Sequence, residues 1–144
     1  MQVQQGRVFI DRLAYQADLL AALTDVCKKE NIRLGYFSVI GAVTCANLGY
    51  YDQQNQEYTD CVQMDKKLEI ASCVGNISLK DGDIFVHAHA TLADHDGKCY
   101  AGHLMPGTKI FAAEYVVHEL TGVEMHREYD SETGLSLWLR SKEF

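Results

Sequence analysis

The sequence predicts an α+β domain, a mostly antiparallel sheet with one main covering helix. Only residues 17–30 show the apolar spacing of an amphipathic helix, whereas most of the remaining chain consists of short stretches rich in β-branched and aromatic residues. Short polar turns join these stretches, and the one proline, Pro106, lies in no Pro-rich linker. A chain of 144 residues with this composition is expected to form a single domain over residues 1–144.

Residues 7–13 read as a first strand, and the predicted helix over residues 17–30 follows. One apolar stripe runs along this helix, formed by Leu19, Leu20, Leu23, Val26 and Cys27. Asp18 near its start and Lys28 and Lys29 near its end complement the helix dipole, and Asn31 is a suitable stop. The helix is therefore expected to cover one face of a sheet.

The rest of the chain is expected to form strands, several of them joined as hairpins. Residues 80–83 and residues 94–98 have the composition of tight turns. The expected strands are 34–40, ending at Gly41, then 46–51, 57–64, 68–77, 84–94, 98–103, 110–120, and a closing hairpin of 123–129 with 135–139. So many short strands favour coverage of a sheet edge by another subunit.

Composition excludes some classes of protein. The net charge is −7, with 13 basic against 20 acidic residues, which disfavours unaided binding to duplex DNA. The five cysteines form no Cys-Xaa-Xaa-Cys pair and suit reduced thiols in the cytoplasm. No apolar run approaches about 20 residues, so no membrane span is expected, and the N-terminus lacks the pattern of a signal peptide.

Two histidines stand out in the stretch over residues 84–94. As a strand, it places Ile84, Val86, Ala88, Ala90 and Leu92 on one face, and Phe85, His87, His89 and Thr91 on the other. His87 and His89 are then about 7 Å apart along the strand, within reach of one metal ion. His103 follows a turn that can return the chain beside them, and three imidazoles resemble an open catalytic zinc site. The alternative is a metal-free cluster of hydrogen-bonded imidazoles.

Several segments together resemble the PPC (plants-and-prokaryotes-conserved) domain family. They are Arg12-Leu13 before the helix, residues 35–43 (GYFSVIGAV), residues 48–52 (LGYYD), residues 87–90 (HAHA) and residues 102–104 (GHL). The chain is similar to prokaryotic members over roughly residues 7–139. It departs from them at the helix start, where Gln16-Ala17-Asp18 replaces the usual Gly-Glu-Asp.

The resemblance implies an α+β fold that assembles as a homotrimer. Plant relatives bind DNA through AT-hook segments, and this sequence contains no Arg-Gly-Arg-Pro core of such a hook. The histidine segment is also similar to that of α-acetolactate decarboxylase, whose three metal ligands match His87, His89 and His103. A cupin is disfavoured because Pro106-Gly107 follows His103, whereas the second cupin motif places them before its histidine.

Two other residues are candidates for a catalytic role. Arg12 lies in an apolar strand and could hold a substrate carboxylate, or form a structural ion pair. Glu114 lies in an apolar run and could act as a general acid or base, bond a metal ligand, or form an interface ion pair. His95 is expected to be exposed in a turn, and His118 and His126 to be structural.

Two functional hypotheses follow. The first is a trimeric protein that binds a divalent metal, zinc, at a small-molecule site with lyase-like or hydrolytic chemistry. The second is a DNA-binding or regulatory assembly module, as the plant relatives suggest. The sequence names neither a substrate nor a reaction.

Overall fold

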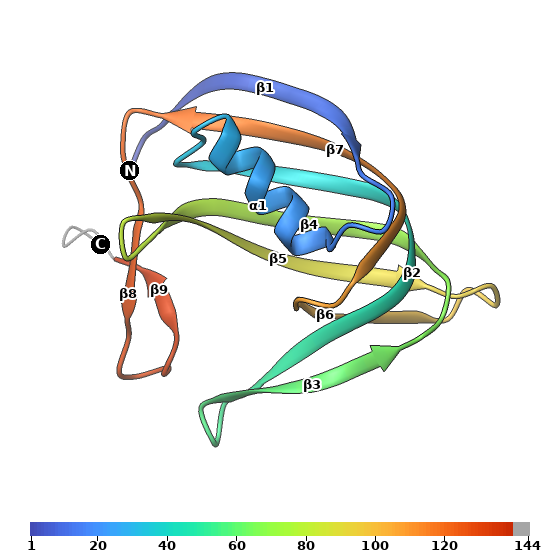
Figure 1. Ribbon diagram of the computed structural model, residues 1–144. Coiled ribbons are helices and arrows are strands. Elements are labelled where there is room, and N and C mark those ends of the chain that lie inside the picture. The colour runs from blue at the N-terminus through green and yellow to red at the C-terminus, as the bar shows by residue number, and fades with distance from the viewer. Residues whose placement is uncertain (140–144) are drawn as a thin grey trace.

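The computed structural model describes residues 1–139, which fold into one helix and nine strands (Figure 1). The last five residues of the predicted single domain, 140–144, lie outside the described part. The elements are β1 (Gln4–Leu13), α1 (Leu19–Lys29), β2 (Gly35–Asp52), β3 (Glu57–Met64), β4 (Leu68–Lys80), β5 (Asp83–Ala93), β6 (Cys99–Leu104), β7 (Lys109–Thr121), β8 (His126–Tyr129) and β9 (Ser136–Trp138). This mostly-strand architecture agrees with the predicted α+β class.

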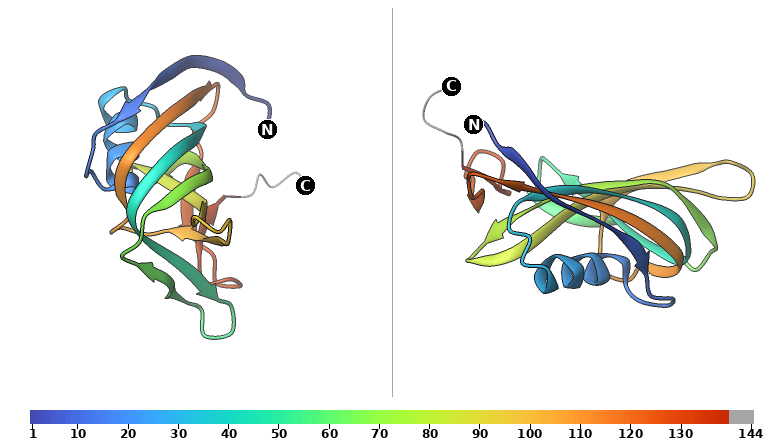
Figure 2. Two further views of the ribbon diagram at one scale, coloured as in Figure 1. Left: turned by 90° about the vertical axis from the view of Figure 1, so that its right-hand side faces the viewer. Right: turned by 90° about the horizontal axis from the view of Figure 1, so that it is seen from above.

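Strand β2 organises the sheet because it is 18 residues long and changes partners along its length. Its first half pairs with β7 on one side and β4 on the other, and its second half pairs with β3 and β6. Since β5 joins β4 to β6, the strands β2, β4, β5 and β6 form a closed ring of pairings. Figure 2 shows the strong curvature that this closure requires.

The helix α1 lies against one face of the curved sheet (Figure 2), as predicted. Asp18 caps its N-terminus by accepting a hydrogen bond from the Ala21 backbone N–H at 3.1 Å, and it also accepts one from the Gly107 N–H at 2.6 Å. The helix residues Leu19, Leu23 and Cys27 are fully buried. The helix is two residues shorter at its start than the range 17–30 predicts, because Asp18 is the cap.

The predicted strand end at Gly41 is wrong, since β2 continues through this residue to Asp52. The ladder with β4 shifts register between Val39 and Gly41, so Gly41 lies at a β-bulge. Its φ is +143°, and a Cβ there would lie 2.1 Å from the Ala112 carbonyl oxygen. Glycine here permits a bend and a close approach within a strand, and the end of a strand was predicted in its place.

The predicted closing hairpin is present as β8 and β9. Strand β8 pairs in parallel with the end of β4, with Lys80 opposite Arg127. This pairing places the hairpin beside the start of β5 (Figure 1). Within residues 1–139, the structure has no helix with the length and hydrophobicity needed to cross a membrane.

Candidate metal centre

The three predicted ligands converge in the structure. His87 and His89 project from the same face of β5, and His103 lies directly opposite His89 in the β5–β6 ladder. The ring centroids of the three histidines are 4.9–5.4 Å apart. One nitrogen from each ring lies within 4.8 Å of the others. The sequence therefore predicted this cluster from strand alternation and one return strand.

The nitrogen positions fit a small divalent cation. His87 Nε2 and His103 Nδ1 are 3.2 Å apart. Two nitrogens at zinc bond lengths of about 2.0–2.1 Å and a tetrahedral angle lie about 3.3 Å apart. Three neutral imidazoles leave one tetrahedral position for another ligand, which is the donor set of a catalytic rather than a structural zinc site.

The surroundings keep the imidazoles of His87 and His103 neutral. Burial, together with the smaller effects of the nearby His103, Arg127 and His89, lowers the pKa of His87 to about 4. Burial also lowers the pKa of His103, with smaller contributions from His89 and Arg127. At neutral pH both rings therefore offer a lone pair, as a metal ligand must.

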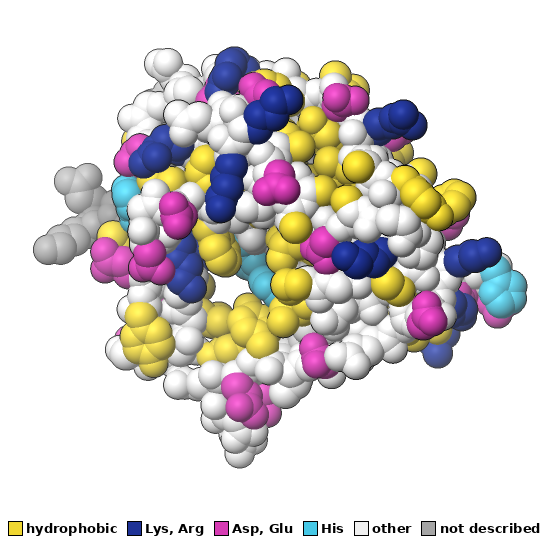
Figure 3. Space-filling model, viewed as in Figure 1, with side chains coloured by type: hydrophobic (Ala, Val, Ile, Leu, Met, Phe, Trp, Pro, Cys, Tyr) yellow, Lys and Arg dark blue, Asp and Glu magenta, His cyan; other side chains and the backbone are white. Residues whose placement is uncertain are grey.

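A pocket of about 300 Å³ opens in front of the histidines. In Figure 3, histidine side chains lie in a hollow that is bordered by hydrophobic groups. Tyr58 of β3 covers one side, with its ring centroid 4.8 Å from that of His103. The β8–β9 hairpin forms the opposite side through residues 134–137. Tyr51 of β2 ties the two sides together by donating a hydrogen bond to the Thr133 carbonyl at 2.7 Å.

Arg127 also lines this pocket, and the sequence analysis did not identify it. It lies 40 residues from His87 and follows no motif, so neither spacing nor alternation relates it to the histidines. Only the parallel pairing of β8 with β4 brings it there. Its Nη2 lies 3.5 Å from His87 Nδ1, and the residue is only 8% exposed.

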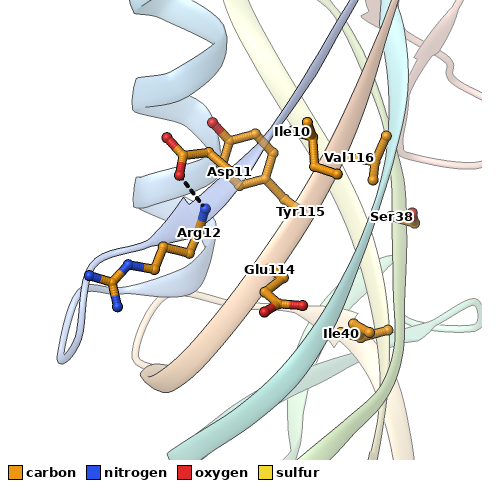
Figure 4. Close-up of a pocket in the computed structure, with 8 residues that line it drawn as sticks. All are labelled: Ile10, Asp11, Arg12, Ser38, Ile40, Glu114, Tyr115 and Val116. Carbon is orange, nitrogen blue, oxygen red and sulfur yellow. Dashed lines mark hydrogen bonds between the residues drawn. The ribbon is translucent and has the colours of Figure 1, made fainter.

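The structure places Arg12 and Glu114 in a different pocket, on the outer face of the sheet (Figure 4). The two residues are opposite each other in the β1–β7 ladder, and neither forms an ion pair within residues 1–139. In Figure 4 the Arg12 guanidinium points away from Glu114. Neither lines the histidine pocket of this chain. Their catalytic role stays a prediction, and within one chain they line a different pocket from His87 and His103.

A second cluster of potential ligands has a structural explanation. Asp94, His95 and Asp96 lie close together in the turn between β5 and β6. The Asp94 carboxylate pairs with Lys66 and accepts hydrogen bonds from Tyr100 and from two backbone N–H groups of its own turn. His95 is exposed, as predicted, and lies beside Asp96. This cluster stabilises a turn.

The fold belongs to a known class of domain. Residues 1–121 match the profile of the Plants and Prokaryotes Conserved (PCC) domain, and the chain belongs to this family. The β8–β9 hairpin, with Arg127, lies beyond the matched residues.

Solved structures agree with this assignment. A metal-containing protein from Archaeoglobus fulgidus is 39% identical, with a TM-score of 0.91 over 96% of this chain and 97% of its own. A PPC protein from Pyrococcus horikoshii is 33% identical, with a TM-score of 0.91 over 98% and 96%. A candidate DNA-binding protein from Bacteroides thetaiotaomicron is 25% identical, with a TM-score of 0.84 over 94% and 96%.

Among curated proteins, the chain resembles part of the bifunctional protein GlmU from two Synechococcus strains. The identities are 31% and 29% over 130 residues, which is 89% of this chain. The chain spans about a fifth of the length of these relatives.

Proposed function

We propose that the chain binds one divalent metal ion, zinc, through His87, His89 and His103, and presents it to a small molecule. The convergence of one nitrogen from each ring within 4.8 Å carries this proposal. The neutral state of His87 and His103 supports it, as does a 39% identical relative described as a metal-containing protein. The predicted cytoplasmic setting would suit such a site and stays a prediction.

The geometry suits a carbonyl or carboxylate compound. A zinc ion with three histidine ligands can polarise a bound oxygen or lower the pKa of bound water. The chain itself encloses the ligand between Tyr58 and the β8–β9 hairpin, which limits access of bulk water. Hydrolytic and lyase-like reactions both suit this arrangement.

Elemental analysis of protein purified without chelators and without a histidine tag tests the metal site. We expect close to one zinc ion per chain, and a loss of affinity of more than about 100-fold in His87→Ala, because a direct ligand is removed. His95→Ala is the matched control, since this histidine is exposed and lies outside the cluster. A metal-free wild-type protein, or equal metal content in His87→Ala, would refute the proposal.

We also propose that the protein forms the homotrimer that the family resemblance implies. A mostly apolar row crosses the outer face of the sheet, running through Val74, Ser38, Val116 and Ile10 on neighbouring strands. Ile10 is 79% exposed and Val74 is 52% exposed. Apolar surfaces of this kind are typical of protein interfaces.

DNA binding is the alternative function, and the description of the Bacteroides relative favours it. The net charge of −7 opposes it, because duplex affinity depends on neutralising phosphates. Fluorescence anisotropy with a labelled duplex at low salt tests whether the protein binds DNA. Affinity that falls steeply with added salt would support DNA binding. We expect no binding to the duplex.

A further inference from the structure

We propose that Arg127 is an anion-binding residue of the histidine pocket, and that the pocket selects a short carboxylate compound. This inference rests on the proposed metal site and names the class of ligand that the site accepts. Arg127 is only 8% exposed and lines the same pocket as His87 and His103.

The guanidinium has no anionic partner in the described part of the chain. Its Nε donates to Ser78 Oγ at 2.8 Å, its Nη1 to the Ser136 carbonyl at 3.0 Å, and its Nη2 to Asn76 Oδ1 at 2.8 Å. All three acceptors are neutral. The rings of Phe85 and Trp138 lie 5.2 and 5.7 Å from its Cζ. A buried cation held only by neutral groups is costly unless an anion joins it.

The nearest charged groups do not supply that anion. Among the described residues, Glu57 is the one carboxylate that lines the pocket, and it is exposed and forms no ion pair with Arg127. Lys80, which also lines the pocket, adds a further positive charge. A divalent metal on the histidines would make the pocket still more positive. The pocket therefore has an unbalanced positive charge that a ligand can neutralise.

Hydrogen-bond donors face one another at the same place. If His87 binds a metal through Nε2, its neutral ring carries a hydrogen on Nδ1. Nδ1 then faces Arg127 Nη2 across 3.5 Å, so two donors meet without an acceptor between them. One Nη1 hydrogen of Arg127 is also left over after its bond to Ser136. A carboxylate is acceptor-only and could accept from these groups.

The spacing limits the size of the ligand. Only the imidazole ring of His87 separates the guanidinium from the metal position. The pocket volume of about 300 Å³ is at the lower end of the range for ligand sites. A compound with one carboxylate for Arg127 and a second oxygen donor a few bonds away for the metal fits both limits.

Titration calorimetry with malonate and its neutral diamide, malonamide, tests the proposal on zinc-loaded and metal-stripped protein. We expect malonate to bind at least about tenfold more tightly than malonamide in both forms, since charge-assisted hydrogen bonds are roughly twice as strong as neutral ones. Arg127→Gln should bring this preference below about threefold while zinc content stays unchanged. Arg33→Gln is the matched control, because Arg33 pairs with exposed Glu124 outside the pocket.

A purely structural role for Arg127 makes a different prediction. Arg127→Gln would then lower the melting temperature and leave the malonate preference intact, which would overturn the proposal. If Arg127→Gln does not fold, Arg127→Lys replaces it and should keep only part of the preference, because the bidentate fork is lost.

If neither variant folds, the same malonate and malonamide titrations on metal-stripped Lys80→Gln protein decide which cation binds the anion. Lys80 is the other cation that lines the described pocket. A malonate preference that survives Lys80→Gln supports Arg127, and one that disappears with it overturns the proposal. Malonate preference without zinc binding would refute the metal site alone. Zinc binding without malonate preference would refute the anion site alone.

Discussion

At the level of single residues, the predictability of the site depends on where its members lie in the chain. His87 and His89 share a strand face through simple alternation, and His103 follows one turn later. A local sequence pattern was therefore enough to predict the histidine cluster. Arg127 approaches the same pocket through a long-range parallel pairing, which no local pattern encodes. Arg12 was a candidate because of its place in an apolar strand and the family resemblance, and it lines a pocket on another face of the sheet.

The carboxylate of Asp94 is expected to stabilise the β5–β6 turn in a pH-dependent way. The ion pair with Lys66, together with hydrogen bonds from the backbone of Lys98 and Asp96 and from Tyr100, lowers the pKa of Asp94 to about 2. Because the folded-state pKa is below the ordinary 3.8, the stabilisation is present above pH 3.8 and is lost as the pH falls toward about 2.

Thermal unfolding followed by circular dichroism measures this effect. Asp94→Asn should melt at a lower temperature than the wild type at neutral pH, and the difference should shrink as the pH approaches 2. Asp25→Asn on the exposed face of α1 is the control, because Asp25 forms no ion pair within residues 1–139. A difference that is constant with pH would show that the charge of Asp94 is not responsible.

At the level of elements, β6 illustrates how a small residue positions a ligand. Gly102 precedes His103 and lies so close to β2 that a Cβ would be 2.7 Å from the Gly49 carbonyl oxygen. The pair Gly49 and His103 is one of two that join β6 to β2. A larger residue at 102 must therefore push β6 away and move His103 from the cluster.

We expect Gly102→Ala to reduce the free energy of unfolding by about 1–3 kcal/mol and to weaken zinc binding. Chemical denaturation and competition with a chromophoric chelator measure the two effects. Ala101→Ser on the same strand is the control, since this residue is exposed and such changes usually stay within about 0.5 kcal/mol. Unchanged zinc affinity in Gly102→Ala would show that the position of His103 does not depend on this close approach.

At the level of the whole molecule, the positions of the strands were largely predictable, whereas their closure was not. Alternation and turn residues located β3 to β7 because these signals are local. The ring of β2, β4, β5 and β6 depends on β2 changing partners around its bulges, and a break was predicted at Gly41 instead. A bulge and a strand end share the same residue signal, so only the pairing distinguishes them.

The proposed trimer gives the last prediction, because the apolar row on the outer face and the histidine cluster lie on different parts of the chain. Ile40 is 59% exposed beside the apolar row on the outer face, so a charge there should break an interface that buries it. Ile40→Glu should reduce the mass measured by light scattering from three times the chain mass of 16.2 kDa to a single chain.

Tyr50→Glu is the matched control, since Tyr50 is equally exposed at 59% but lies on the second half of β2. All three histidines of the cluster come from the same chain, so monomeric Ile40→Glu should keep its zinc. If the monomer loses its zinc while remaining folded, the site needs a neighbouring subunit. Arg12 and Glu114, which line the outer-face pocket together with Ile40, would then regain their interest as catalytic residues supplied across that interface.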